Sequence, residues 1–375
     1  MTPNQVVMAI AAVFFVLGAL DRCLGCRFGF GREFEKGFGL MGTVALSILG
    51  LICIAPVVSS LLAPVIVPVF QLLGADPAMF SGTILAPDSG GYSIAAELAE
   101  DPEMAYFGGL IVASVMGGVI SFSIPTACGI IEKEDTRFFA VGVLAGFMVD
   151  PIGCFVGGLA AGLPPMTVLH NLVPVVIIAL LIILGLALVP QKMIRGFQIF
   201  SRGLVVVIMI GLILGAVKQM TGLTLVEGIN PITDGFQTVG SVTITLAGTI
   251  PFVWFLTRVA EKPLERLGQL IGVNAVTVSC ALVSLSSVVP SFVSYREMNV
   301  RGKVVMGAFA ASMSNMLGAH LGFTVATNEA YIIPMFTAKV VAGVLAVAAG
   351  YWFTSRLFAR ELEEERARQA AGQSQ

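Results

Sequence analysis

The chain is 375 residues long; 57% of its residues are hydrophobic, only 12% are charged, and its formal net charge is −2. Soluble domains carry about 25% charged residues, so half that share, spread over many apolar segments, excludes an ordinary soluble domain. The composition predicts a polytopic membrane protein, and the small net charge gives no indication of nucleic-acid binding.

The N-terminal stretch MTPNQVVMAI has no Lys or Arg ahead of its apolar run and no small-residue cleavage site. This pattern predicts a retained first helix and not a signal peptide. Of six scattered cysteines, only Cys23 and Cys26 form a C-x-x-C pair. Because no second pair and no well-placed His accompanies them, we interpret the cysteines as small apolar residues and predict no metal site and no cofactor.

Long apolar runs predict about nine membrane crossings. They cover about 5–20, 38–58, 104–124, 138–162, 166–189, 203–220, 236–256, 304–323 and 331–353. The loops 21–36 and 192–202 are basic, so the positive-inside rule predicts that they are cytoplasmic and that the N-terminus is outside. We expect a membrane domain over 1–359 and a charged, cytoplasmic C-terminal tail over 360–375.

Two further segments, 76–99 and 271–293, do not fit a simple alternation of crossings. All basic loops fall on the inside only if each segment enters and leaves the membrane on one side, the first outside and the second inside. The predicted fold is therefore an all-α polytopic membrane protein. It has about nine transmembrane helices plus two re-entrant, discontinuous helical elements, or about 10–11 helices if these elements cross.

A faint internal repeat agrees with this topology. Gly74-Ala-Asp-Pro aligns with Gly272-Val-Asn-Ala, and the same offset aligns Ser114 with Ser312. The repeat covers about 38–162 and about 236–355, and the loop charges predict opposite orientations for the two copies. An inverted repeat is typical of transporters that bind substrate near the bilayer midplane, between paired broken helices.

Asp88 is the strongest candidate for binding a substrate. It lies in the first predicted tip, Pro87-Asp88-Ser89-Gly90-Gly91. A carboxylate at membrane depth costs at least about 2.5–3.5 kcal/mol, so it needs a partner or a task. The alternative is that Asp88 caps the helix that follows it. Tyr92 offers a hydroxyl or a π-face to a cation, or simply packs.

The opposing tip carries Ser286 and Ser287, whose hydroxyls suit a small polar ligand or bond back onto their own helix. Asn315 lies in mid-span and either contacts the substrate or bonds one helix to another. The predicted outside loops carry several acids and no base, which would concentrate a cationic solute. The positive-inside rule also depletes bases there.

Four more residues are candidates for coupling or gating: Glu97, Asp150, His320 and Lys339. Glu97 fits a solvated surface acid equally well. Asp150 precedes Pro151 within a span, and Lys339 could neutralise Asp88 or Asp150 or form a structural ion pair. His320 could sense pH or be a satisfied interfacial histidine. The chain has no Walker A, G-x-S-x-G or H-E-x-x-H motif, so we expect that it is not an enzyme.

Several stretches keep a recognisable order along residues 34–351. They include FEKGFGLMG at 34–42, GADPAMFSGTILAPDSGGYSIAAELA at 74–99, VLAGFMVDPIGC at 143–154 and GAHLGF at 318–323. In these stretches the chain resembles the EutH family of ethanolamine transporters. The resemblance implies a multi-pass permease of the bacterial inner membrane that imports ethanolamine. The residues in matching patterns are Asp88, Gly90, Gly91, Glu97, His320 and Lys339.

Three features depart from the family pattern. Ala319 stands where the family has an acid before the His, Ser286 and Ser287 stand where it has amides, and Asp150 is not usual. Ethanolamine is an ammonium with one hydroxyl at neutral pH, so its site needs a carboxylate or π-face and one or two neutral hydrogen-bonding groups. Asp88 with Ser286, Ser287 or Asn315 supplies that set of groups. The expected transport mechanism is alternating access.

The departures leave two alternatives open. One is a cation-coupled transporter of another small amine or polar solute, and the other is a membrane scaffold or sensor that keeps a transporter architecture. The expected partners are the small-molecule substrate and the lipid bilayer. A homo-dimer or homo-trimer is expected only by analogy with other transporters that have paired re-entrant elements.

Overall fold

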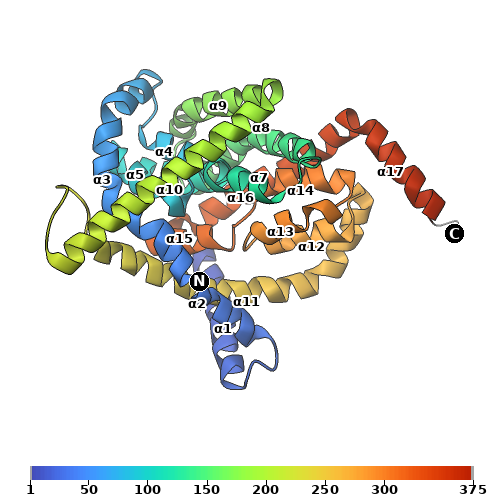
Figure 1. Ribbon diagram of the computed structural model, residues 1–375, viewed down its shortest axis with the longest axis horizontal. Coiled ribbons are helices and arrows are strands. Elements are labelled where there is room, and N and C mark those ends of the chain that lie inside the picture. The colour runs from blue at the N-terminus through green and yellow to red at the C-terminus, as the bar shows by residue number, and fades with distance from the viewer. Residues whose placement is uncertain (1, 373–375) are drawn as a thin grey trace.

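The computed structural model describes residues 2–372, and every regular element in that range is helical (Figure 1). Among the described residues, seven helices are long and apolar enough to cross a membrane, or eight if one bent pair counts as a span. They are α1 (Pro3–Cys23), α2 with α3 (Phe30–Gly39 and Met41–Leu72), α8 (Thr136–Ala160), α9 (Pro165–Leu188), α10 (Pro190–Thr221), α11 (Ile232–Ile271) and α16 (Ile332–Leu357). The predicted class, an all-α polytopic membrane protein, is confirmed.

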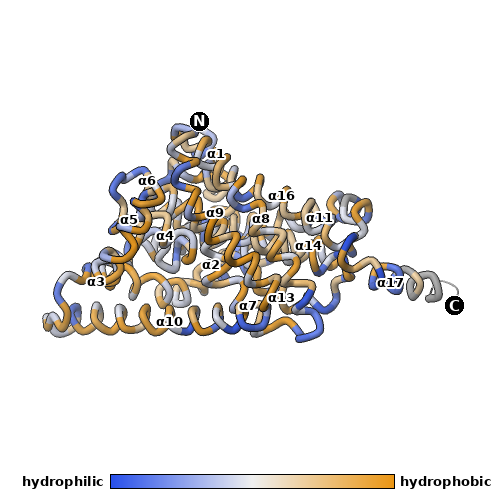
Figure 2. The backbone as a smooth tube through the Cα atoms, turned by 90° about the horizontal axis from the view of Figure 1, so that it is seen from above, coloured by the Kyte–Doolittle hydropathy of each residue, from blue (hydrophilic) through white to orange (hydrophobic). Residues whose placement is uncertain are grey.

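Apolar side chains cover the outside of this body. The outward faces of α9 and α10 expose Leu181 at 61% and Ile213 at 59%, which lipid tolerates and water does not. Figure 2 shows α10 as a largely apolar rod along one edge, while α17 (Ala359–Gly372) is polar and projects from the body. The basic stretch 192–202, predicted as a loop, is the helical beginning of α10.

The predicted crossing at 304–323 is not one helix. It consists of α14 (Val300–Ser312) and α15 (Ala319–Thr327), separated by a break at 313–318. The backbone of Asn315 is left-handed there, with φ of 58°, which a helix cannot accommodate. Residues 313–318 contain no proline and no paired glycine, so the break was not apparent within the apolar run.

The first predicted re-entrant element is a hairpin of short helices. It contains α4 (Ala78–Ile84), the 3₁₀ turn η1 (Pro87–Ser89) and α5 (Gly91–Leu98). Its two ends meet, because the Asp76 Oδ2 accepts hydrogen bonds from the backbone N–H groups of Glu100 and Asp101, both at 3.0 Å. This first hairpin (76–101) therefore returns to the side from which it starts.

The second predicted element has the same design. It contains α12 (Ala275–Ser284), α13 (Val289–Val293) and the turn η4 (Tyr295–Glu297). Asn274 Nδ2 donates to the carbonyl of Glu297 at 2.9 Å, and Asn299 Nδ2 donates to the carbonyl of Gly272 at 2.8 Å. This second hairpin (272–299) also closes on itself. Figure 1 shows the two hairpins in opposite halves of the molecule.

Each hairpin is followed by an interrupted helix and then by a long one. After the first come α6 (Pro102–Tyr106), the π-helical η2 (Phe107–Gly117) and η3 (Val119–Ser123), and α7 (Ile124–Ile130), bent by 41° at Gly118. After the second come α14 and α15. The long helices are α8 and α16, which pack closely: a Cβ on Gly153 of α8 would lie 2.5 Å from the Ala338 carbonyl of α16.

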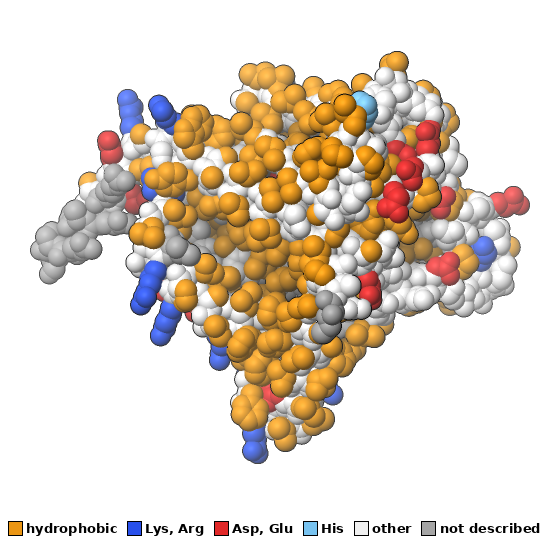
Figure 3. Space-filling model, turned by 180° about the vertical axis from the view of Figure 1, so that it is seen from behind, with side chains coloured by type: hydrophobic (Ala, Val, Ile, Leu, Met, Phe, Trp, Pro, Cys, Tyr) orange, Lys and Arg blue, Asp and Glu red, His pale blue; other side chains and the backbone are white. Residues whose placement is uncertain are grey.

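Loops that the sequence assigned to one side contact one another. At one end, the Tyr331 hydroxyl donates to Glu103 at 2.5 Å, and Asn4 Nδ2 donates to the Ala330 carbonyl. At the other end, three ion pairs join the segments 132–137, 296–303 and α17; they are Arg296–Glu132, Lys303–Asp135 and Arg137–Glu361. Figure 3 shows acidic side chains gathered towards one side of the apolar surface and basic ones towards the other.

Candidate functional site

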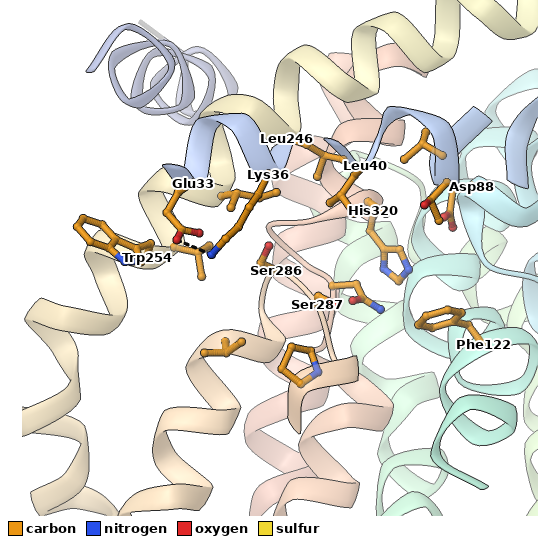
Figure 4. A pocket seen from close by; sticks show the side chains of 18 of the residues that line it. Glu33, Lys36, Leu40, Asp88, Phe122, Leu246, Trp254, Ser286, Ser287 and His320 are labelled. Carbon is orange, nitrogen blue, oxygen red and sulfur yellow. Dashed lines mark hydrogen bonds and ion pairs between the residues drawn. The ribbon is translucent and has the colours of Figure 1, made fainter. Parts of the chain in front are cut away.

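A cavity of about 800 Å³ lies where the tips of the two hairpins approach each other (Figure 4). Its lining comes from α2, α3, η1, η3, α11, the ends of α12 and α13 with the break between them, the break at 313–318, and α15. Six of the predicted site residues line it: Asp88, Ser89, Ser286, Ser287, Asn315 and His320. Figure 4 shows Asp88 and the two tip serines on opposite sides, with His320 between them in this view.

Asp88 occupies the 3₁₀ turn at the tip of the first hairpin. The turn ends at Gly90, whose φ of 101° is open to glycine but strained for other residues. The helix α5 starts there without any side-chain cap, so the alternative in which Asp88 caps α5 is wrong. Asp88 is half-buried and forms no ion pair with any Lys, Arg or His that the structure describes. Its charge therefore faces the cavity without a cation of the protein beside it.

Ser286 and Ser287 lie in the break between α12 and α13. Both are half-buried and line the cavity. The neighbouring Ser284 bonds back onto its own helix, with Oγ donating to the Ala281 carbonyl at 2.8 Å. Within the described chain, neither Ser286 nor Ser287 makes such a side-chain bond, so both hydroxyls remain available to a ligand.

Asn315 lies in the break between α14 and α15, and its side chain holds this break against the second hairpin. Its Oδ1 accepts a hydrogen bond from the Val288 N–H at 3.3 Å. The helix-to-helix bond that the sequence suggested for Asn315 is therefore present, and the same residue lines the cavity. A contact between Asn315 and a substrate stays a prediction.

His320 is the second residue of α15 and is only 4% exposed. Its Nδ1 has no hydrogen-bond partner among the described residues. Ala319, which stands in place of the acid expected from the family pattern, also lines the cavity. This wall is therefore less acidic than the pattern implies.

The other predicted residues lie away from the cavity lining. Gly90 and Gly91 form the back of the tip, and a Cβ on Gly90 would lie 1.6 Å from a methyl carbon of Leu51. The Tyr92 ring stacks on Tyr106 with centroids 5.6 Å apart, and Glu97 is exposed near the end of α5.

Asp150 and Lys339 are 0% and 1% exposed and lie between α8, α14 and α16. Neither neutralises Asp88. The lysine ammonium donates to the Ser114 carbonyl at 2.6 Å, and Asp150 accepts from the Ser312 hydroxyl at 2.6 Å. The ion pair suggested between Asp150 and Lys339 is not among the ion pairs of the described residues.

The mouth of the cavity was not predicted. Glu33 and Lys36 of α2 form an ion pair at 2.6 Å there, and the Arg258 guanidinium lies over the Trp254 ring at 4.1 Å on α11. The amphipathic pattern of 30–39 is the sequence feature that could have indicated a helix at this mouth. The residues at the mouth belong to basic segments, which the positive-inside rule places on the same side as the other basic loops.

A lipid-facing helical body, two broken hairpins and a cavity between their tips that a few polar side chains line define a polytopic membrane protein of the kind that binds solutes at helix breaks. The chain belongs to the EutH family: the family described as "Ethanolamine utilisation protein, EutH" matches residues 3–353. This agrees with the resemblance in the sequence motifs.

Curated relatives match almost the full chain. A protein of Listeria monocytogenes named "Probable ethanolamine permease EutH" is 44% identical over 97% of this chain and 98% of its own length. A protein of Salmonella typhimurium with the same name is 40% identical over 96% and 98%. "Uncharacterized protein YxeR" of Bacillus subtilis is 39% identical over 96% and 98%. No solved structure matches the chain.

Proposed function

We propose that this protein is a permease that imports ethanolamine across the bacterial cytoplasmic membrane by alternating access. One observation carries the proposal: Asp88, a carboxylate without a protein cation, lines a cavity opposite Ser286 and Ser287. The family membership suggests which substrate this cavity binds, because relatives at 40–44% identity are named probable ethanolamine permeases.

The chemistry of the cavity suits ethanolammonium. The ammonium group donates charge-assisted hydrogen bonds to Asp88, which replaces part of the hydration that the cation loses. The substrate hydroxyl bonds to Ser286, Ser287 or Asn315, since a hydroxyl can both donate and accept. A single carboxylate with neutral partners binds a monovalent cation and still releases it.

The cavity mouth bears Lys36 and Arg258, so the positive-inside rule supports a cytoplasmic opening. In this proposal, aromatic rings close the opposite side: Tyr106 stacks on Tyr92 and also packs on Tyr331, with ring centroids 5.2 Å apart. In this proposal the conformation is inward-open, and outward opening separates these tyrosines. The two hairpins return at opposite ends of the body, which supports the inverted repeat that alternating access exploits.

Uptake into proteoliposomes tests the function. The assay measures labelled ethanolamine at a pH well below the pKa of the free amine, where little neutral ethanolamine crosses the lipid. The wild type should exceed protein-free vesicles, and Asp88→Asn should lose most of that uptake. Asp234→Asn is the matched control, because Asp234 is an exposed acid at the start of α11. Wild-type uptake equal to that of protein-free vesicles would sink the proposal.

A second candidate function is transport of another small amine, and Ala319 in the cavity wall favours it. Thermal unfolding with a panel of amines, with and without Na⁺, separates the two. A ligand that binds only the folded protein raises its stability by RT ln(1 + [L]/Kd). Stabilisation by ethanolamine alone supports the first function, and stronger stabilisation by a different amine supports the second.

A further inference from the structure

A second polar cluster is buried outside the cavity lining. Its four members are Ser114 of η2, Asp150 of α8, Ser312 at the end of α14 and Lys339 of α16, and none is more than 1% exposed. Buried charges in a membrane domain are costly and mark ion or proton sites more often than structural ones. The binding of ethanolamine at Asp88 makes no use of this buried cluster.

The hydrogen bonds in the buried cluster leave one acceptor open. The Ser312 hydroxyl donates to Asp150 Oδ1 at 2.6 Å, while the Lys339 ammonium donates to the backbone carbonyls of Ser114 at 2.6 Å and Ser312 at 3.4 Å. The second carboxylate oxygen, Asp150 Oδ2, is buried and has no partner among the described residues. Buried polar atoms are normally satisfied, so this oxygen requires an explanation.

The open oxygen suits a proton better than a metal ion. Na⁺ and similar hard cations need several oxygen ligands. The two carbonyls that could serve are already occupied by the Lys339 ammonium. A metal ion would also place a second full cation beside that ammonium in a dry interior. A proton needs only Oδ2, and it changes the combined charge of Asp150 and Lys339 from zero to plus one.

The buried cluster is joined to both walls of the cavity. Ser312 ends α14, and the break that follows it carries the cavity residue Asn315. Ser114 lies in η2, where a Cβ on the nearby Gly117 would lie 1.9 Å from the Leu85 carbonyl in the first hairpin. Protonation of Asp150 removes the negative charge that the Ser312 hydroxyl hydrogen-bonds. Because Ser312 is the last residue of α14, the weakened hydrogen bond affects the end of that helix.

Two other titratable side chains interact electrostatically with this pair. Cys154, one turn beyond Asp150 on α8, interacts with both Asp150 and Lys339. His320 of α15, which lines the cavity, interacts with Lys339. The charge on the buried cluster therefore affects His320 in the cavity wall electrostatically, in addition to its effect on the backbone of α14.

We propose that Asp150, held by Ser312 beside Lys339, is a proton-binding site that couples ethanolamine import to proton entry. The proton binds Asp150 Oδ2 while the site is open to the outside, and it leaves from the same oxygen to the cytoplasm with the substrate. In each transfer one O–H bond breaks and one forms: hydronium outside gives the proton to Asp150 Oδ2, and Asp150 then gives it to water on the cytoplasmic side. The inference rests on the ethanolamine import proposed above, and it assigns the energy source of that import.

The experiment measures exchange and proton entry separately. Vesicles contain purified protein, the pH dye pyranine, and equal K⁺ on both sides with valinomycin to hold the voltage at zero. Exchange of labelled for unlabelled ethanolamine reports transport alone. Pyranine then reports lumen pH when ethanolamine is added outside. Proton coupling acidifies the lumen, whereas passive entry of the neutral amine makes it alkaline.

Asp150→Asn keeps the shape of the side chain and removes its proton exchange. We expect it to retain exchange within about threefold of the wild type and to lose the acidification per ethanolamine transported. Thr354→Val is the matched control, because Thr354 is a fully buried hydroxyl on α16 that bonds only the Gly350 carbonyl. The control should keep both signals.

Each outcome has a defined meaning. The coupling is contradicted if wild type and Asp150→Asn acidify the lumen equally per ethanolamine transported. It is also contradicted if the wild type exchanges ethanolamine without acidifying the lumen. Either result leaves the permease function standing. A wild type without exchange overturns the permease and the coupling with it. If Asp150→Asn does not fold, the variant Ser312→Ala tests the proton site instead. Loss of its hydroxyl should shift the pH midpoint of uptake upward by about 0.5–1 unit, because the carboxylate loses a donor, and an unchanged midpoint contradicts the proposal.

Discussion

The backbone N–H of Asn315 donates a hydrogen bond to the carbonyl of Ser284 at 2.8 Å, and this bond joins two interrupted helices. A second bond, from the Leu317 N–H to the Leu285 carbonyl at 2.7 Å, continues the pairing. The two interrupted helices therefore provide hydrogen-bond partners for some of the backbone N–H and C=O groups that the breaks at 285–288 and 313–318 leave unpaired. Unpaired backbone is tolerated at membrane depth only where it is buried in protein or lines a water-filled cavity. Here each break is covered by the other, and both contribute to the cavity lining.

Substitutions at Asn315 separate its backbone role from its side-chain role. Both Asn315→Gly and Asn315→Ala lose the bond to Val288 and the cavity-facing amide, so both should raise the KM for ethanolamine. Alanine is strained at φ of 58° and glycine is not, so Asn315→Ala should be less stable by about 1 kcal/mol. Thermal unfolding in detergent and uptake kinetics measure the two effects. Equal stability of the variants would contradict the backbone role.

The tip of the first hairpin should not accept a side chain at Gly90. Gly90→Ala adds a Cβ 1.6 Å from a methyl carbon of Leu51, in addition to the strain of φ at 101°. Gly74→Ala is the control, because its φ of 69° is equally left-handed but nothing lies within 4 Å of the new Cβ. Gly90→Ala should cost roughly 1–3 kcal/mol more than the control and displace Asp88. A similar unfolding temperature for both variants argues against close packing at the tip.

Asp76 should contribute strongly to the stability of the first hairpin. Its carboxylate accepts bonds from the N–H groups of Ala78, Glu100 and Asp101, and Asp76→Ala leaves them without this partner. A buried group left unsatisfied costs about 1–3 kcal/mol, so the loss should exceed that of an ordinary helix cap. Asp101→Ala provides that comparison, because Asp101 caps only the exposed N–H of Glu103. A smaller loss for Asp76→Ala than for Asp101→Ala would contradict this role.

The proposed orientation can be tested with thiol labelling. Cys23 is an exposed native cysteine, and it lies within the basic loop 21–36 that is predicted to be cytoplasmic. In a variant whose only cysteine is Cys23, a membrane-impermeant maleimide should label inside-out vesicles and not intact cells. In a cysteine-free background, Thr224→Cys places a thiol in the exposed loop 222–231 and should label in intact cells. The reverse pattern would place the cavity mouth outside.

The sequence by itself was sufficient for the class of the protein and for the positions of the two hairpins, whereas the break at 313–318 was missed. Proline, glycine and a carboxylate within one apolar segment identified the first tip, and Asp88 does line a cavity there. The alignment of Gly74 with Gly272 matched two left-handed glycines, with φ of 69° and 74°, at the starts of the two hairpins: Gly74 lies just before the first, and Gly272 begins the second. These features depend on local composition, which governs polarity and backbone freedom whatever the neighbours are.

Tertiary packing decided where the side chains point. Tyr92 and Asp88 are four residues apart, yet only Asp88 faces the cavity, since Tyr92 stacks on Tyr106. Lys339 reaches the carbonyl of Ser114, and not Asp88, because η2 and α16 pack against each other. A lysine can neutralise any acid within its reach, and only the packed helices determine which carbonyls and acids that reach includes. The charge pattern and the two hairpin tips could thus be predicted from the sequence, whereas the break at 313–318 and the partners of each buried charge required the fold.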